Sequence, residues 1–185
     1  MATVTATRVP LLEREQVPPE LQQLYDGLLK QRSVVPNMFK TVAHVPGLAL
    51  GFAGLLKALL SDGALPGWYK ELIATRMSVL CGSQYAVGGH SLSAKQKGAS
   101  DQQIAAVKAD YENGPFSDQE KLGLRCADRL HRSGREVDDE FFARLKSAFN
   151  DQQIVELFAA ASVFEFFPRF VDGLCIPITP APGQG

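Results

Sequence analysis

This 185-residue sequence has few cysteines, no marked excess of positive or negative charge, and few long apolar runs. Nineteen lysines and arginines oppose twenty aspartates and glutamates, so the formal net charge is −1. A chain with so balanced a charge has no large basic field with which to hold a phosphate backbone. We therefore expect no nucleic-acid partner.

The cysteines and the apolar stretches both indicate a cytoplasmic protein. The three cysteines are widely spaced, at Cys81, Cys126 and Cys175. This odd number supports neither a disulfide framework nor a four-ligand zinc site, so we expect reduced thiols. Residues 1–13 lack the apolar core of a signal peptide. The most apolar stretch, residues 45–60, is shorter than a bilayer span and contains Pro46 and Lys57, so we expect no membrane attachment.

Strand patterns are also missing, whereas helical spacing and helix-start signals recur along the chain. Apolar spacing predicts helices over residues 20–31, 38–44 and 46–60. The last of these is nearly all apolar, and we expect it to be heavily buried. Prolines or capping residues mark the further starts, at Pro66, Ser83, Ser100, Ser117, Asp138 and Asn150. The predicted fold class is all-α.

The length and composition suit one compact domain, which we place at residues 20–175. Residues 1–19 contain Pro10, Pro18 and Pro19 and predict an extended N-terminal arm. Residues 176–185, with three prolines and two glycines, predict a flexible tail. So many apolar helices in a small chain imply more apolar surface than one core can bury, and we expect a homo-oligomer.

The stretch with most chemical content is Glu71-Leu-Ile-Ala-Thr-Arg76 followed by Ser83-Gln-Tyr-Ala-Val-Gly-Gly-His90. In this pattern the chain resembles the carboxymuconolactone decarboxylase family, which shares the AhpD-like all-helical fold with the alkylhydroperoxidases. Glu71 takes the family's acidic position, Tyr85 its aromatic position and His90 its imidazole position. The resemblance extends over roughly residues 8–177 and implies a trimer or hexamer.

The departure from the family concerns its two redox cysteines, whose positions are taken by Ser83 and Ala86. Peroxidase members need a thiolate to attack the peroxide and a second thiol to resolve the sulfenic acid. A serine hydroxyl cannot replace them, and Cys81 has no cysteine three residues on. A peroxide-reducing role through Cys81 therefore stays as one alternative, and a catalytically lapsed binding or assembly protein of the same fold as another.

An acid and an imidazole remain without the thiol pair. Ser83 and His90 are seven residues apart and fall within roughly 20° on one helical face. We predict His90 as a catalytic proton shuttle, Glu71 as its catalytic orienter, and Ser83 and Tyr85 as substrate-binding residues. The resemblance implies a cofactor-independent lyase or isomerase that acts on a small carboxylated or lactone-type metabolite, through loss of carbon dioxide and reprotonation.

Other motifs in the sequence have ordinary structural explanations. No metal-ligand spacing or phosphate-binding glycine loop appears, so we expect neither metal nor cofactor. We assign the C-terminal phenylalanines Phe158, Phe164, Phe166, Phe167 and Phe170 to a core or a subunit interface. Arg169 is expected in a salt bridge, with Glu156 as its candidate partner.

Overall fold

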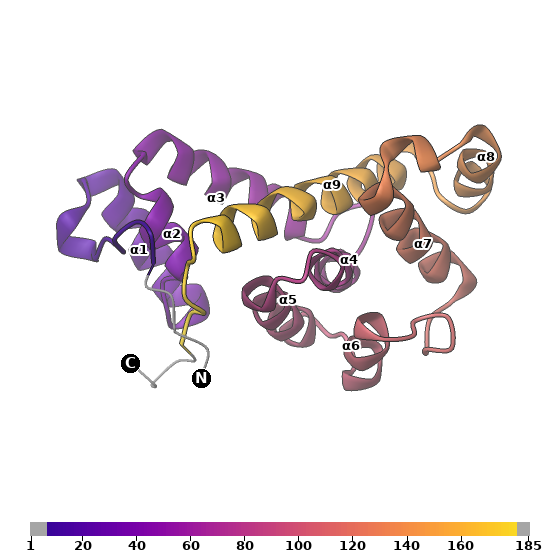
Figure 1. Ribbon diagram of the computed structural model, residues 1–185, viewed down its shortest axis with the longest axis horizontal. Helices are drawn as coiled ribbons and strands as arrows, with labels where there is room; N and C mark the ends of the chain where they lie inside the picture. Colours follow the sequence, from indigo (N-terminus) through magenta and orange to yellow (C-terminus); the bar gives the residue numbers. More distant parts are fainter. Residues whose placement is uncertain (1–6, 181–185) are drawn as a thin grey trace. The chain divides into compact units, whose positions relative to one another are not determined.

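The structure, a computed structural model, describes residues 7–180 and confirms the all-α prediction. No residue in this range lies in a β-strand, as Figure 1 shows. Over the same range, no helix combines the length and the apolar character needed to cross a bilayer. The elements in chain order are η1 (Arg14–Gln16), α1 (Pro19–Arg32), α2 (Asn37–Val42), α3 (Pro46–Leu60), α4 (Gly67–Leu80), α5 (Gln84–Gln96), α6 (Asp101–Lys108), α7 (Asp118–Arg132), η2 (Gly134–Glu136), α8 (Asp139–Ala148) and α9 (Asp151–Gly173).

Capping residues start these helices where the sequence predicted. Ser100 and Ser117 each form a capping box, with Gln103 and Glu120 as the respective third helical residues. Asp138 accepts a hydrogen bond from a backbone N–H in the first turn of α8. The side chains satisfy N–H groups that have no partner within the helix, which is why short-range sequence signals locate the helix starts.

By their contacts, the described residues form two compact units. One unit comprises residues 7–57 and 170–180, and the other comprises residues 58–169. Helices α3 and α9 each contribute residues to both units. A single domain over residues 20–175 therefore stays a prediction.

In the first unit, the predicted N-terminal arm is bound to its own chain. The Leu12 N–H donates to the Lys40 carbonyl at 3.0 Å, and the Tyr25 hydroxyl donates to the Leu12 carbonyl at 3.0 Å. The 3-10 turn η1 interrupts the extended course that we expected for residues 1–19. Residues 1–6 of that predicted arm lie outside the described part of the chain.

Asn37 holds the described part of the predicted C-terminal tail. Its N–H donates to Thr179 Oγ1 at 2.9 Å, and its side-chain amide donates to the Pro177 carbonyl at 3.0 Å. Ile176 is buried. Residues 176–179 are therefore anchored rather than loose, and residues 181–185 lie outside the described range.

The expectation that residues 46–60 are heavily buried is wrong. In α3, Leu48, Leu50 and Leu55 are 48%, 43% and 44% exposed. Among the leucines of this helix only the last two, Leu59 and Leu60, are buried. A helix that is apolar on every side needs neighbours on every side, and a single chain covers only part of this one.

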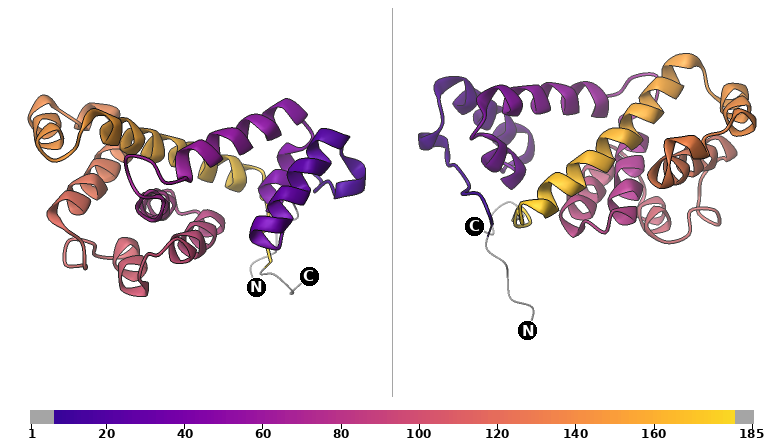
Figure 2. Two further views of the ribbon diagram at one scale, coloured as in Figure 1. Left: turned by 180° about the vertical axis from the view of Figure 1, so that it is seen from behind. Right: turned by 45° about the horizontal axis from the view of Figure 1, so that its top comes forward.

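In the second unit, most residues of α4 are buried, and two of the buried residues carry charge. It packs against α5, α6 and α7, and α5 lies beside it in all the views of Figures 1 and 2. Its side chains include Lys70 and Glu71, which are only 1% and 0% exposed. Because an isolated buried charge is very costly, each of these two residues requires a partner.

The partner of Lys70 is Glu156 of α9, with 2.8 Å between Nζ and Oε2. The Glu156 carboxylate also accepts two backbone N–H groups from the turn before α4. Burial alone would raise the pKa of Glu156, but Lys70 and these N–H groups outweigh it and lower the pKa. The candidate pair of Glu156 with Arg169 is therefore wrong: Arg169 forms its ion pair with Glu165, one helical turn before it on α9.

Close packing of α4 against α7 makes Gly123 sensitive to any added atom. A Cβ at this position would collide with the Tyr69 hydroxyl, which is buried and donates to the Glu120 carbonyl at 2.6 Å. We expect Gly123→Ala to lower the free energy of unfolding by about 1–3 kcal/mol, measured by urea denaturation. Gly27→Ala is the control, because a Cβ there meets nothing within 4 Å and alanine favours the helix. Equal stability of the two variants would contradict this packing.

Self-association stays a prediction, and the exposed leucines of α3 offer a way to test it. We expect sedimentation equilibrium to give the mass of a trimer or hexamer. Leu48→Glu combined with Leu55→Glu places two charges on one helical face, and should shift the mass towards the monomer with the circular dichroism unchanged. Val155→Glu, at a position 67% exposed on α9, is the control. A monomeric wild-type protein would rule out self-association, and an unchanged mass of the double variant would exclude α3 from the contact.

Candidate active site

The side chains of Glu71 and His90 meet, a contact that the predicted role of Glu71 as orienter of His90 requires. Glu71 Oε2 lies 2.7 Å from His90 Nδ1, which joins α4 to α5. The second carboxylate oxygen, Oε1, lies 2.6 Å from Lys97 Nζ at the end of α5. Both oxygens of the buried carboxylate are therefore paired. We call these three residues the Glu71 cluster.

Lys97 is the member of this cluster that the sequence analysis missed. Ser83, His90 and Lys97 are spaced by seven residues, so all three lie near one face of α5. Extending the spacing of Ser83 and His90 by one more step would have placed Lys97 on the same helical face, but its contact with Glu71 comes from the tertiary structure. Lys97 Nζ also donates to the Leu60 carbonyl at 2.8 Å, which fixes the direction of its long side chain.

The electrostatics of the cluster keep Glu71 ionised. Burial alone would raise the pKa of this carboxyl, but the hydrogen bonds and charges of His90 and Lys97 outweigh burial and lower the pKa. An ionised carboxylate can only accept hydrogen bonds, so Nδ1 of His90 carries the proton that it donates to Glu71. The tautomer of the ring is thereby set, and Nε2 is the atom available for proton exchange.

His90 is positioned by packing as well as by its hydrogen bond. The ring edge meets Phe164 of α9, with 4.4 Å between the centroids and 72° between the planes. Phe164 is fully buried, so the phenylalanine assigned to a core also forms one wall beside the imidazole. The His90 side chain itself remains 18% exposed.

The two predicted substrate-binding residues lie at the start of α5. Ser83 is buried, and its hydroxyl caps the helix by accepting the Ala86 N–H at 3.4 Å. Tyr85 is half-buried in the first turn. Their roles in substrate binding stay predictions.

A pocket of about 350 Å³ lies next to Lys97 of the Glu71 cluster. It is lined by Leu60, Ser61, Asp62 and Lys97. His90 is not among these lining residues, so this pocket reaches the Glu71 cluster through Lys97 and not through the imidazole.

Two of the cysteines occupy contrasting surroundings in the second unit. Cys81 follows α4, and its thiol donates to Glu165 Oε2 at 3.6 Å. Cys126 lies buried in α7, where burial raises the pKa of its thiol to about 12. Buried in this way, Cys126 has the character of an inert core residue.

Comparison with known proteins supports the resemblance drawn from the sequence. Residues 46–128 match the sequence pattern of the carboxymuconolactone decarboxylase family. Over these residues the chain is similar to the carboxymuconolactone decarboxylase family. The matched residues include every member of the Glu71 cluster.

Two bacterial relatives share part of this sequence. The uncharacterized protein YnjA of Escherichia coli is 29% identical over 109 residues, which are 58% of this chain and 59% of YnjA. The uncharacterized protein YdfG of Bacillus subtilis is 27% identical over 89 residues, which are 48% of this chain and 60% of YdfG. The matches thus span about three fifths of each relative.

Solved structures with the same fold confirm the AhpD-like architecture. An uncharacterized peroxidase-related protein from a Silicibacter species superposes with a TM-score of 0.86 at 21% identity, covering 98% of this chain and 96% of its own. The debrominase Bmp8 in complex with 2,3,4-tribromopyrrole has a TM-score of 0.82 at 23% identity, covering 94% of this chain and 92% of its own. At these identities the likeness concerns the fold alone.

The charge on Glu71 makes stability depend on pH. Its pKa is lower in the folded protein than the ordinary value of 4.5, so the unfolded state binds the proton more readily. The stabilisation is present above about pH 4.5 and is lost as the pH falls through the folded pKa. At neutral pH we expect Glu71→Gln to lower the free energy of unfolding by about 1–3 kcal/mol, because a charged hydrogen-bonded partner is lost.

Urea denaturation between pH 7 and pH 3 tests this contribution. Glu71→Gln should lose less stability on acidification than the wild type. Glu140→Gln, at an exposed position in the first turn of α8, should keep the wild-type slope. Identical slopes for Glu71→Gln and the wild type would show that the carboxylate does not hold this charge.

Proposed function

We propose that the protein is a cofactor-independent lyase or isomerase that moves a proton on a small carboxylated or lactone-type metabolite. The observation that carries this proposal is the 2.7 Å contact between Glu71 Oε2 and His90 Nδ1. An imidazole whose Nδ1–H is held by a buried carboxylate presents Nε2 as a positioned acid or base. His90 is the proposed catalytic residue, and Glu71 acts through it as a positioning residue.

In a decarboxylation, the proton from His90 would replace the carboxylate that the substrate loses as carbon dioxide. When the carboxylate of a substrate leaves as carbon dioxide, the electron pair of the broken carbon–carbon bond passes to the adjacent unsaturated carbonyl system. Protonated Nε2 of His90 then gives its proton to the carbon that lost the carboxylate, and the ring regains a proton from water. In an isomerisation, the neutral ring would first remove a proton from carbon and then return it at another position.

The other members of the Glu71 cluster support this role for His90. Lys97 supplies a positive charge to Glu71 Oε1, so the carboxylate stays ionised while the ring gains and loses its proton. Phe164 restricts the tilt of the ring from the side of α9. Both contacts reduce the reorganisation that proton transfer would otherwise require.

A peroxide-reducing function through Cys81 is the second candidate, because the solved neighbour from a Silicibacter species is described as a peroxidase-related protein. The carboxylate of Glu165 faces the Cys81 thiol at 3.6 Å, and a nearby negative charge disfavours the reactive thiolate. A catalytically lapsed binding protein is the third candidate, supported by the replacement of both family cysteines.

A decarboxylation assay in deuterated water tests the leading candidate. The probes are small carboxylated lactones of the muconolactone type, and the readouts are release of carbon dioxide and deuterium at the decarboxylated carbon. We expect His90→Gln to lower kcat by at least roughly 100-fold, because the amide cannot exchange the proton. Glu71→Gln should lower kcat less than His90→Gln does, since the ring stays present without its orienting carboxylate.

His44→Gln is the matched control, because the His44 ring contacts the Pro10 carbonyl in the first unit. It should leave kcat unchanged. An unchanged rate in His90→Gln would refute the mechanism. Turnover of an organic hydroperoxide that disappears in Cys81→Ser would favour the second candidate, and a wild-type protein inactive towards every probe would favour the third.

A further inference from the structure

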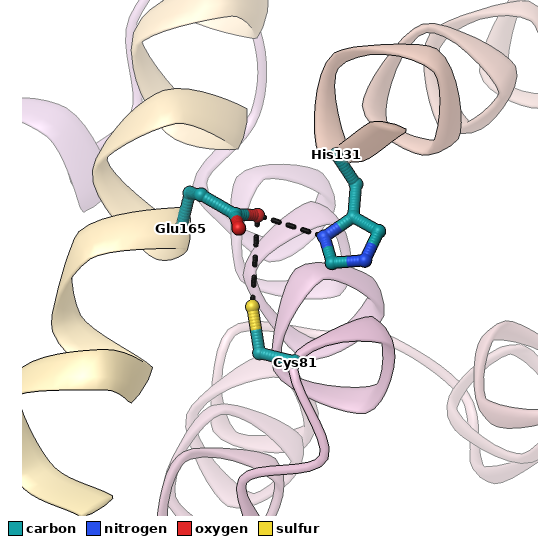
Figure 3. Close-up of side chains that lie close together, drawn as sticks. All are labelled: Cys81, His131 and Glu165. Atoms are coloured by element: carbon teal, nitrogen blue, oxygen red, sulfur yellow. Dashed lines mark hydrogen bonds and ion pairs between the residues drawn. The ribbon is translucent and has the colours of Figure 1, made fainter. Parts of the chain in front are cut away.

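A second cluster of chemically active side chains lies apart from the Glu71–His90 pair. Cys81 follows α4, His131 lies near the end of α7, and Glu165 lies on α9, as Figure 3 shows. Glu165 Oε2 is 2.8 Å from His131 Nδ1 and 3.6 Å from Cys81 Sγ. All three potential ligand atoms lie within 4.8 Å of one another. We call these residues the Cys81 cluster.

Two of the three distances between these ligand atoms lie within about 0.5 Å of those in a zinc coordination shell, and the third lies within 4.8 Å. Zinc binds thiolate sulfur at about 2.3 Å and imidazole nitrogen or carboxylate oxygen at about 2.0–2.2 Å. Tetrahedral ligands at those bond lengths stand roughly 3.3–3.8 Å apart. The sulfur–oxygen distance of 3.6 Å already fits. The nitrogen–oxygen distance of 2.8 Å is that of a hydrogen bond and would open by about 0.5 Å around an ion.

The ligand types also select the metal. A thiolate excludes the hard cations magnesium and calcium, whereas a thiolate, an imidazole and a carboxylate together suit zinc. A thiolate and a carboxylate carry two negative charges, so a divalent ion makes the three-ligand shell neutral.

Arg169 contacts the Glu165 carboxylate without being one of the three potential zinc ligands. Glu165 Oε1 is buried and forms an ion pair with Arg169, one turn later on α9. Oε2 is therefore the oxygen turned towards Cys81 and His131, as the dashed contacts in Figure 3 show. Outer partners that fix a ligating carboxylate are a regular feature of zinc sites. All three ligand residues are half-buried, so an ion can reach them.

From this geometry we infer that Cys81, His131 and Glu165 form a zinc-binding site with a fourth position open to water or an exchangeable ligand. Binding of the ion displaces the thiol proton of Cys81 to solvent, and it moves the proton of His131 from Nδ1 to Nε2. Three protein ligands with one open position are typical of zinc sites that exchange their fourth ligand. The site is independent of the proton transfer assigned to His90.

Titration of the chelator-treated full chain with zinc tests the site. Isothermal calorimetry should give one zinc per chain, with heats in different buffers reporting release of a proton. With cobalt(II) in place of zinc, we expect the visible bands of a tetrahedral ion together with a sulfur-to-cobalt charge-transfer band. Cys81→Ser should remove the charge-transfer band, and it should weaken zinc binding by at least roughly 100-fold. His131→Gln and Glu165→Gln should each weaken binding by a comparable factor.

Matched substitutions separate this site from the other polar clusters. Cys175→Ser, His44→Gln and Glu140→Gln change the same residue types elsewhere and should bind zinc as the wild type does. Loss of binding in His90→Gln would move the ion to the Glu71 cluster and overturn the assignment. Absence of one-to-one zinc binding by the wild type, or a cobalt complex without the charge-transfer band, would also overturn it. The cobalt spectrum of the wild type decides the question even where a variant fails to fold.

Discussion

The buried negative charge of Glu71 is the constraint on which the organisation of the second unit depends. Its side chain is fully buried within α4, where an unpaired carboxylate would be strongly destabilising. The charge is tolerated because α5 supplies a hydrogen-bond donor to each oxygen, from His90 and Lys97. One arrangement thus stabilises the packing of α4 on α5 and sets the tautomer of the imidazole. Structural and chemical roles of the carboxylate cannot be separated, since both follow from the same two contacts.

Helix α9 connects this arrangement with the rest of the unit. Along its length it presents Glu156 to Lys70, then Phe164 to His90, and then Glu165 to Cys81 and His131. Adjacent residues on a helix point in directions about 100° apart, so Phe164 and Glu165 contact different clusters. A change in the position of α9 would therefore affect the acid–base pair and the sulfur-containing cluster together.

The acid–imidazole pair and the thiol lie in different clusters of this protein. Glu71 and His90 form one contact, and Cys81 belongs to the other cluster. The positions of the family's cysteine pair hold Ser83 and Ala86, and both are used for local structure in the first turn of α5. The acid and the imidazole remain in contact, and they suit proton transfer without sulfur. Sulfur is found instead at Cys81, beside a carboxylate and a second imidazole, which is an environment for a metal ion more than for a nucleophilic thiolate.

The amino-acid sequence was sufficient to predict the helices and most of their start points, because capping side chains and helical spacing act over a few residues. The family resemblance implied that Glu71 orients His90, and the structure brings the two side chains into contact although they are 19 positions apart. Only the tertiary structure decided that Lys97 completes this cluster, that the leucines of α3 stay exposed, and that Cys81, His131 and Glu165 converge. Those three residues are 84 positions apart at the extremes, on elements whose packing no local signal specifies. Convergence between helices depends on how their faces fit together, and that fit arises only when the whole unit folds.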